Sequence, residues 1–279
     1  MRWGIFARNG FEGAEAFRQG ILEIGHQAKP VQSASDYTSS ACFEPFDLIV
    51  LFGLHWHGVD ILRDYTTHHI PVVVVDYGYL KRTNHAHDWR VGHWQTSING
   101  LNRLSPLEDP TRFNALSIEV AERGGDPDGY ILLCVQTVGD ASHGRSEKEL
   151  QQWCDEQANQ WPGLLIRPHP LQAELTYGLP VCPAKTLNEA LAGARLVVTG
   201  NSNTGNDCLR AGVPVIATFP GAAWADLSGP TLPSLERRLR HFRRCANSQW
   251  TWAEFRTGVP QRSLLNQLGY CEQSTLPLF

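Results

Sequence analysis

The chain has 279 residues, of which 42% are hydrophobic, and its formal net charge is −4 at pH 7. This length suits two compact domains of roughly 100–150 residues each, and the composition excludes a disordered chain. No apolar run approaches the roughly 18–20 residues of a membrane-spanning helix, so no membrane insertion is expected. The negative charge argues against a generic nucleic-acid coat, although a local basic patch can still bind a phosphate backbone.

Two further features bear on the cellular compartment. The N-terminal sequence MRWGIFARNGFEG lacks the apolar core and the small-residue cleavage site of a signal peptide. The seven cysteines are widely scattered and include no C-x-x-C pair, which indicates neither a disulfide framework nor a zinc ribbon. We therefore expect a cytoplasmic protein whose cysteines are mostly small buried residues.

The first half of the chain alternates strand and helix patterns. Residues 2–7 predict an opening strand, and apolar residues recur at helical spacing over residues 13–24. Residues 46–52 and 71–77 are continuous apolar runs, which are typical of strands buried on both faces of a parallel sheet. Residues 57–70 supply a helix between these two runs. This order predicts a βαβ unit.

The alternation stops between residues 81 and 128, where the chain is polar, aromatic and interrupted by Gly and Pro. A long connection without periodicity is either an interdomain linker or a functional loop. We place the domain boundary inside it, which gives an N-terminal domain of residues 1–115 and a C-terminal domain of residues 116–279.

Strands and helices alternate again in the second half. A helix over residues 146–161 begins with Ser146 as N-cap and Glu149 at the capping-box position. The other expected elements are strands at 130–137, 163–170, 195–200 and 214–218, helices at 186–194 and 203–212, and one or two helices within 232–258. The second half is therefore predicted to be another parallel α/β unit.

The stretch TGNSNTGNDCLRAGVPVIA, residues 199–217, passes from a strand into a helix through Ser202, Asn203, Thr204 and Gly205. In open parallel sheets, ligands bind beyond the carboxyl ends of the strands, where the next helix begins. Polar donors at this position, together with the helix dipole, fit a diphosphate, and the glycine would allow close approach. Alternatively, Ser202 or Thr204 only caps the helix, which explains the same residues.

The rest of this stretch resembles the donor-binding half of GT-B glycosyltransferases and of UDP-N-acetylglucosamine 2-epimerases. Those families have a small-residue turn, then an acidic residue, then a Gly-x-Pro-Val/Ile ending. The matching residues are Ser202 to Gly205 for the turn, Asp207 for the acid, and Gly212, Pro214 and Val215 for the ending. The resemblance implies that the turn binds the nucleotide diphosphate and that Asp207 binds the ribose hydroxyls, which a carboxylate accepts well. The families usually have Glu at that position, which is one methylene longer.

A second motif, IRPHP, lies at the end of the strand expected at 163–170. It resembles the HP element of capsule-type Kdo transferases and related GT-B enzymes. The resemblance implies that Arg167 and His169 contact the phosphate or the sugar of the donor, while the alternative for a loop histidine is a structural role. The motifs of P-loop enzymes, dinucleotide-binding proteins and α/β-hydrolases are absent from the sequence.

A transferase that inverts the anomeric centre needs a base that takes the proton of the acceptor hydroxyl. Asp76 follows four valines at the end of an expected strand, where buried neighbours would raise its pKa. Alternatively, Asp76 pairs with Lys81 or Arg82. His55 and His57, at the end of the preceding strand, are the next candidates because histidine titrates near neutral pH.

The segment NHAHDWRVGHW raises the question of a metal site at His85, His87 and His93. We disfavour this interpretation because no carboxylate or cysteine completes a defined coordination geometry. Enzymes that this chain resembles usually need no bound metal. We therefore expect no metal and no cofactor, and a nucleotide-sugar co-substrate whose nucleotide is UDP.

Basic and aromatic residues suggest where an acceptor would bind. One face of a helix near the C-terminus carries Arg237, Arg240 and Arg244, a pattern typical of a solvated face that can also follow a phosphate backbone. Further positive charge is contributed by Lys81, Arg82 and Arg90. The aromatic residues expected to stack on an extruded base are Tyr79, Trp89 and Trp94.

The segment VVDYGYLKR…HWQTSINGLN is similar to small GT-B-like proteins of tailed bacteriophages. This resemblance implies double-stranded DNA with 5-hydroxymethylpyrimidine as the acceptor. We expect a GT-B-like α/β fold, with two Rossmann-like parallel-sheet halves facing across a cleft, the donor in the second half and the acceptor in the first. Two other functions stay open, namely a surface-glycan transferase or nucleotide-sugar 2-epimerase, and a non-enzymatic nucleotide or nucleic-acid binding module.

Overall fold

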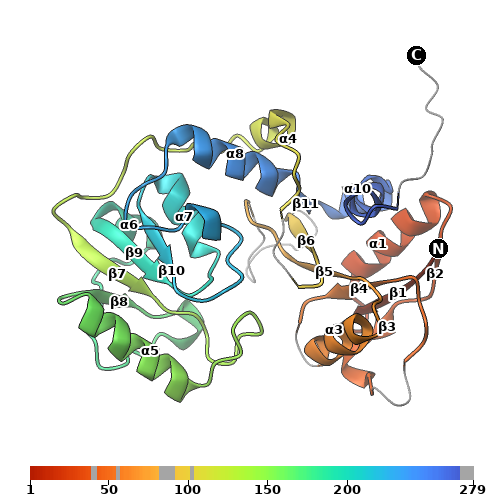
Figure 1. The fold of residues 1–279 in the computed structure, drawn as a ribbon, viewed down its shortest axis with the longest axis horizontal. Coiled ribbons are helices and arrows are strands. Elements are labelled where there is room, and N and C mark those ends of the chain that lie inside the picture. Colours follow the sequence, from red (N-terminus) through yellow and green to blue (C-terminus); the bar gives the residue numbers. More distant parts are fainter. Residues whose placement is uncertain (39–42, 55–56, 82–91, 101–103, 271–279) are drawn as a thin grey trace. The chain divides into compact units, whose positions relative to one another are not determined.

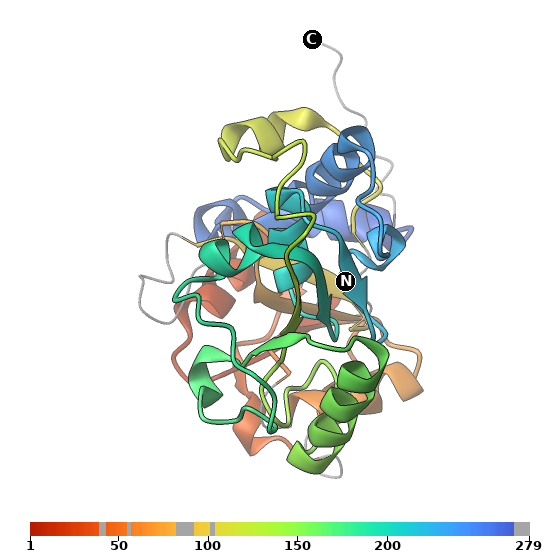
Figure 2. The ribbon, with the colours of Figure 1, turned by 90° about the vertical axis from the view of Figure 1, so that its left-hand side faces the viewer.

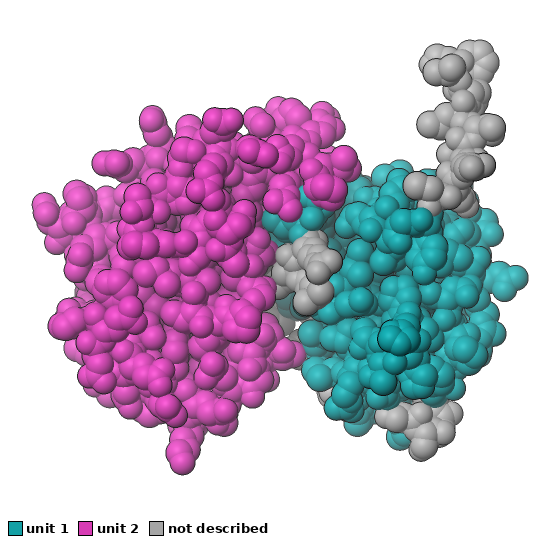
Figure 3. Space-filling view, in the orientation of Figure 1, with its two compact units in different colours: residues 1–105, 246–279 teal, residues 106–245 magenta. Residues whose placement is uncertain are grey.

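The computed structural model describes residues 1–38, 43–54, 57–81, 92–100 and 104–270. The chain divides into two compact units (Figure 3). Unit 1 comprises residues 1–105 together with 246–279, and unit 2 comprises residues 106–245. The first division lies at residue 105, where we expected one at 115, and the C-terminal segment belongs to unit 1. Each unit has its own sheet and its own core.

Unit 1 contains a sheet of seven strands in which the expected parallel strands lie at the centre (Figure 1). The sheet order is β11-β6-β5-β4-β1-β2, and β3 also pairs with β1. The strands are β1 (Arg2–Ala7), β2 (Gln27–Ala28), β3 (Gln32–Ser33), β4 (Leu48–Phe52), β5 (Val72–Tyr77), β6 (Trp94–Ile98) and β11 (Gln249–Trp250). Strands β1 to β5 pair in parallel, whereas β6 is antiparallel to both β5 and β11. Three of the expected strands are thereby confirmed.

Helices cover both faces of the unit 1 sheet, as the continuous apolar runs predict. Along β5, Val73 and Val75 belong to the cluster under α1 (Glu12–Glu23), α9 (Trp252–Arg256) and α10 (Val259–Gln267). Val72 and Val74 belong to a second cluster, under α3 (Gly58–Thr67). Because successive side chains of a strand point to opposite faces, every valine of β5 is buried.

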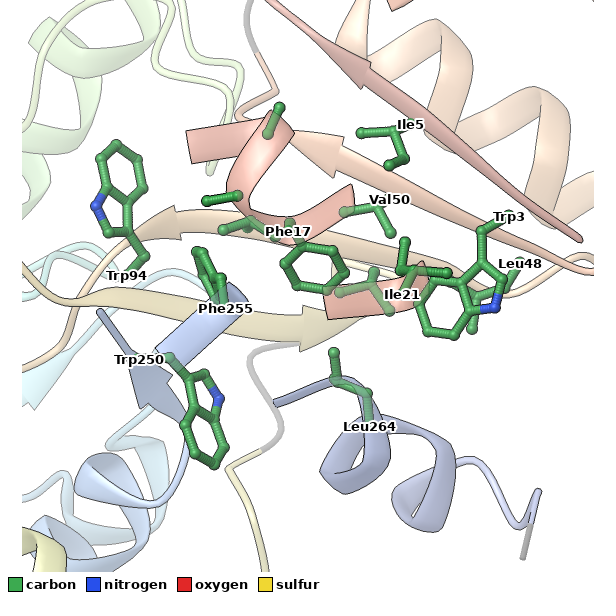
Figure 4. Close-up of a cluster of buried hydrophobic side chains, with 14 of the residues drawn as sticks. Trp3, Ile5, Phe17, Ile21, Leu48, Val50, Trp94, Trp250, Phe255 and Leu264 are labelled. Atoms are coloured by element: carbon green, nitrogen blue, oxygen red, sulfur yellow. The ribbon is translucent and has the colours of Figure 1, made fainter. Parts of the chain in front are cut away.

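The first of these clusters joins the two ends of the chain (Figure 4). Phe17 and Ile21 of α1 lie beside Phe255 of α9 and Leu264 of α10. The rings of Phe17 and Phe255 have centroids 5.0 Å apart in an edge-on arrangement, a favourable geometry for aromatic pairs. The helices after residue 250 therefore complete the core that begins with β1 and α1.

Unit 2 contains a parallel sheet of four strands in the order β10-β9-β7-β8. Its strands are β7 (Tyr130–Cys134), β8 (Leu165–Arg167), β9 (Ala194–Thr199) and β10 (Val215–Ala217), which confirm four expected strands. Helix α5 (Glu147–Gln160) covers one face of the sheet (Figures 1 and 2) and packs on it through Leu150, Trp153 and Cys154. Two short helices, α6 (Leu187–Ala192) and α7 (Thr204–Ala211), contact β9.

Local signals fix the helix ends of unit 2 as the sequence predicts. Ser146 and Glu149 form a reciprocal capping box at the start of α5, and Thr186 caps α6 in the same way. Helix α7 ends at Gly212, whose φ of 76° lies in the left-handed region that favours glycine. Among the described residues, no helix has both the length and the apolarity that crossing a membrane requires.

Helix α8 (Leu235–Ala246) is one of the helices expected near the C-terminus, and it packs on α4 (Pro110–Ala115). The rings of Phe113 and Phe242 stack with centroids 6.1 Å apart. Arg238 is fully buried, and its guanidinium donates to the carbonyl oxygens of Ala121, Leu209, Glu122 and Pro233. Arg238 thus binds α8 to three other segments of unit 2.

Candidate functional site

The carboxyl edge of the unit 2 sheet is where a ligand site is expected in a parallel α/β unit. Threonine hydroxyls join the strand ends there. The Thr199 Oγ1 donates to the Cys134 carbonyl at 2.8 Å, and the Thr218 Oγ1 donates to the Thr199 carbonyl at 3.0 Å. The Trp153 indole of α5 donates to the Thr218 Oγ1 at 3.1 Å. These bonds satisfy carbonyls at the ends of β7 and β9 and hold the edge rigid.

Asn201 ties together the loops that follow β7, β9 and β10. Its backbone N–H donates to Gln136 Oε1 at 2.9 Å, and Gln136 Nε2 donates to its Oδ1 at 3.0 Å. Its Nδ2 donates to the carbonyls of Ser142 and Pro220, both at 2.9 Å. The Ser142 hydroxyl also donates to Asn201 Oδ1, at 3.1 Å. One side chain therefore sets the relative positions of three loops at the sheet edge.

The α7 turn, residues 202–206, follows Asn201 and begins α7. The Ser202 Oγ accepts from the Thr204 N–H at 3.2 Å and donates to the Thr204 Oγ1 at 3.1 Å. The Gly205 N–H donates to the Ser202 carbonyl, and the Asn206 N–H donates to the Asn203 carbonyl. These three backbone amides are thus engaged within the turn, and the N-cap of α7 is Asn203, which makes no side-chain capping bond. A ligand at this turn would meet side-chain donors and the positive end of the helix dipole.

Trp224 occupies the space beside Gly205 that we expected a ligand to approach. Its indole is fully buried and donates to the Ser202 carbonyl at 2.9 Å. A Cβ atom on Gly205 would lie 1.8 Å from Cε2 of this ring, so any larger residue would force the ring to move. The glycine therefore allows close packing of a tryptophan against the start of α7, and its contact with a ligand stays a prediction.

Asp207 and Arg167 both lie near the end of β7. Burial raises the pKa of the Cys134 thiol to about 12, Arg167 opposes this shift, and Asp207 adds to it. Asp207 is half-buried in the first turn of α7, with a carboxylate oxygen 3.8 Å from the Arg210 guanidinium. The side chain expected to bind the ribose is thus brought to the same sheet edge as the α7 turn.

Arg167 and His169 of the IRPHP motif are both engaged with backbone groups. The Arg167 guanidinium donates to the carbonyls of Ala184 and Lys185 at 2.9 and 3.3 Å. The His169 Nδ1 accepts from the Leu171 N–H at 3.2 Å, at the start of the short helical turn Pro170–Gln172. In this structure both residues position the loop after β8, and their direct contact with a donor stays a prediction.

The candidate bases of unit 1 lie at the carboxyl ends of β4 and β5. Asp76 is half-buried at the end of β5, and its Oδ1 accepts from the Tyr77 N–H at 2.7 Å. Burial, and then the Asp76 charge, raise the pKa of the Tyr77 phenol. His57 directly precedes α3, with its Nδ1 3.2 Å from Asp60 Oδ2, and this contact lowers the pKa of Asp60. His55 lies outside the described residues.

The structure places some of the expected acceptor residues in the core. Trp94 and Tyr79 are each 5% exposed. The Trp94 ring packs against Phe11 at 5.4 Å and stacks on Tyr77 at 5.2 Å between centroids. Stacking on an extruded base is not compatible with this burial. The burial of Trp94 follows from the pairing of β6 with β5, because this register places the Trp94 side chain on the face of the sheet that the helices cover.

The arginines of α8 have partners inside unit 2. Arg240 forms a two-pronged ion pair with Glu108, at 2.9 and 3.0 Å, and this pair lowers the pKa of the Glu108 carboxyl. Arg237 donates to the Asp226 carbonyl at 3.0 Å, and Arg244 is half-buried. Lys81 is exposed at the edge of the described segment 57–81. Three other expected acceptor residues, Arg82, Trp89 and Arg90, lie outside the described residues.

Within the described part of the chain, no group of three or more His, Cys, Asp or Glu residues is arranged to hold a metal ion. His85 and His87 of the histidine-rich segment lie outside it. The residues that sequence reasoning missed are Gln136, Asn201 and Trp224. Of these, only Asn201 had a detectable signal, because it lies next to the small polar residues of the α7 turn.

No protein-family model matches the chain, and no curated protein matches it significantly. Solved structures do match. The KpsC beta Kdo 2,7 transferase of Thermosulfurimonas dismutans has a TM-score of 0.50 and 12% identity over 94% of this chain and 99% of that chain. The beta Kdo 2,4 transferase of the same KpsC has a TM-score of 0.52 and 14% identity over 88% of this chain and 90% of that chain.

A UDP-GlcNAc 2-epimerase of Neisseria meningitidis also matches, with a TM-score of 0.30 and 12% identity over 97% of this chain and 100% of that chain. That TM-score is below the similarity that defines a shared fold. The two Kdo transferases span nearly the whole chain, so both α/β units take part in the likeness. The chain therefore has the GT-B-like α/β fold that its sequence predicts, with a parallel sheet in unit 2 and a sheet in unit 1 that is parallel at its centre and antiparallel at β6 and β11.

Proposed function

We propose that this protein is a nucleotide-sugar-dependent glycosyltransferase that binds its donor at the carboxyl edge of the unit 2 sheet. The observation that carries the proposal is the convergence of Asn201, the α7 turn and Asp207 at that edge. Small polar side chains at a helix N-terminus suit a diphosphate, and a nearby carboxylate suits the ribose hydroxyls.

The α7 turn would stabilise the leaving nucleotide through electrostatics. Its amides already donate to Ser202 and Asn203, so the hydroxyls of Ser202 and Thr204 and the Asn203 amide supply the direct contacts. The helix dipole adds a positive potential that is present before the negative charge develops on the leaving group. Since these parts are fixed by Asn201 and Trp224, little reorganisation accompanies the reaction.

Unit 1 would supply the base that deprotonates the acceptor hydroxyl. Asp76 is our first candidate because its half-buried carboxylate lies at the carboxyl end of a buried strand, where its Oδ1 accepts from the Tyr77 N–H. His57 is the second candidate, since its contact with Asp60 would hold the ring with Nε2 as the accepting atom. The likeness to Kdo transferases suggests a Kdo-type acidic sugar and a carbohydrate acceptor.

The proposal is tested by incubating the protein with a panel of uridine, cytidine and guanosine nucleotide-sugars, with and without acceptors, and measuring released nucleotide. Acceptors are oligosaccharides and double-stranded DNA with or without 5-hydroxymethylpyrimidine. Acceptor-dependent release that Asp207→Ala abolishes is the expected result. The Asp128→Ala variant is the matched control, because Asp128 is an exposed aspartate just before β7, at the amino end of the strand.

The other outcomes separate the alternatives. Product on hydroxymethylated DNA alone assigns the phage-type acceptor, and product on oligosaccharide alone assigns a glycan. If a nucleotide-sugar is converted to its 2-epimer without an acceptor, the protein is an epimerase and the proposed transferase is refuted. Nucleotide binding without any turnover leaves a non-enzymatic binding module and refutes the proposed transferase.

A further inference from the structure

A chain of three hydrogen-bonded side chains runs from α8 to the α7 turn. The His241 Nε2 lies 2.7 Å from Asn206 Oδ1, and Asn206 Nδ2 donates to Asn203 Oδ1 at 2.8 Å. His241 is 3% exposed and Asn206 is 1% exposed, so water does not compete for these bonds. The inner end of the chain is in the core, and its outer end is a residue of the proposed donor site.

The polarity of this chain follows from the chemistry of the two amides. A side-chain amide has one acceptor oxygen and one donor nitrogen. Asn206 uses its amide nitrogen toward Asn203. Its amide oxygen therefore faces His241 and must accept a hydrogen bond from it. His241 therefore carries its proton on Nε2. The Cys245 Sγ, one helical turn later, lies 3.4 Å from the same nitrogen.

The surroundings of His241 keep the ring neutral. The imidazole is buried, and burial lowers the pKa of His241 to about 4, with Arg244 adding to this shift and Asp226 opposing it. Its Nδ1 is a buried atom with no hydrogen-bond partner among the described residues, which agrees with an acceptor lone pair better than with a second N–H. A neutral ring with a single proton has one consistent arrangement here.

We propose that His241 is a positioning residue that sets the orientation of the Asn203 amide at the donor site. Because Asn206 holds Asn203 by its oxygen, the amide nitrogen is the atom that Asn203 directs to its other side. The partial positive charge of that nitrogen favours a diphosphate at the turn. With the proton of His241 on Nδ1 both amides would reverse, and the turn would direct a carbonyl oxygen toward the anion. The inference rests on the proposed function, since it assigns the diphosphate to this turn.

The tautomer can be measured without any ligand. In the full-length protein labelled with 15N, long-range correlation spectra distinguish the two neutral tautomers of each histidine. We expect the Nε2–H form for His241 at pH 7, assigned by comparison with His241→Gln. A Nδ1–H form, or a protonated ring at pH 7, overturns the inference regardless of what the protein binds.

The effect on binding is measured by titrating UDP into wild-type protein and three variants. His241→Leu leaves the buried Asn206 oxygen without its donor, and we expect UDP affinity to fall about tenfold or more. His241→Gln supplies an N–H at a similar reach and should restore most of the affinity. Phe113→Leu, on α4, is the matched control, because it weakens packing on Phe242 of α8 and should lower Tm without changing UDP affinity.

The outcomes of the two measurements are separable. Equal UDP affinity in wild-type protein and His241→Leu overturns the positioning role. A parallel loss in Phe113→Leu also overturns it, since the effect is then one of general stability. If the wild-type protein binds none of the nucleotides in the panel, the proposed function fails. The tautomer measurement then still decides in which direction the hydrogen bonds from His241 through Asn206 to Asn203 run.

Discussion

Replacing Gly205 with alanine tests how the α7 turn is held. The added Cβ would lie 1.8, 2.1 and 2.4 Å from three atoms of the fully buried Trp224 indole, so the ring must move. Overpacking of this kind costs about 1–3 kcal/mol. Movement of the ring also weakens or breaks the 2.9 Å hydrogen bond from the indole to the Ser202 carbonyl, which contributes about 0.5–1.5 kcal/mol.

An opposing effect must be subtracted. Alanine is more favourable than glycine within a helix by at most about 1 kcal/mol. The steric and hydrogen-bond costs together exceed this gain, so we expect Gly205→Ala to lower the free energy of unfolding by about 1–3 kcal/mol. Loss of the indole bond to the Ser202 carbonyl would also shift the α7 turn, which should weaken UDP binding.

The assay is urea unfolding followed by circular dichroism, with an analysis that allows a separate transition for each unit. Gly229→Ala is the matched control, because a Cβ at Gly229 meets no atom within 4 Å, and it should be nearly neutral. In a Trp224→Leu background the steric conflict disappears, so the alanine should then cost nothing or stabilise. A Gly205→Ala protein as stable as the wild type, or an equal cost in both backgrounds, would refute the reasoning.

Three further predictions follow from other parts of the molecule. Asp76→Asn keeps an acceptor for the Tyr77 N–H but removes the base, so turnover should fall by about 100-fold or more while Tm and UDP affinity stay unchanged; an active variant with wild-type turnover shifts the role to His57. His241 has an ordinary pKa of 6.5 when unfolded and about 4 when folded, so the unfolded state binds more protons between these values and stability falls as the pH is lowered through that window. Between pH 7 and pH 4 the free energy of unfolding, measured in urea, should fall by about 3 kcal/mol more for the wild type than for His241→Gln. A parallel pH dependence of the two proteins contradicts the assignment. Arg238→Lys replaces a planar fork bonded to four carbonyl oxygens with a single ammonium, and should cost about 2 kcal/mol, whereas Arg237→Lys at the surface should cost little; equal effects of the two would argue against these four bonds as the cause.

The sequence predicts the central strands and the helix ends because their causes are local. The four valines of β5 are apolar on both faces, which only a doubly covered strand requires. Ser146 with Glu149, and Gly212, carry the chemistry of a helix start and a helix end within a few residues. For the same reason the α7 turn could be recognised, since its strand, polar residues and helix are contiguous.

What the sequence does not predict depends on contacts between distant segments. Strand β6 falls in the stretch that we interpreted as lacking periodicity, and its strand character comes from pairing with β5 and with β11, more than 150 residues later. Trp94 therefore appeared to be a surface aromatic although it is a core residue.

The site shows the same limit. Asn201 and Gln136 are 65 residues apart in the chain, and nothing near either of them signals their mutual hydrogen bonds. The packing of Trp224 on Gly205 could not be predicted either, because Trp224 comes from beyond β10. Sequence spacing can thus predict which sheet edge would bind a ligand, whereas the side chains that hold that edge together are found only in the folded structure.

The return of the chain to unit 1 has a consequence for synthesis on the ribosome. Residues 106–245 are complete and contiguous when they emerge, so unit 2 has everything it needs to fold during translation. Unit 1 has to wait, because Phe255 and Leu264, which cover Phe17 and Ile21, are made after unit 2. Until they emerge, α1 exposes an apolar surface, which makes it a natural client for chaperones, and a premature stop near residue 246 would leave that surface permanently open.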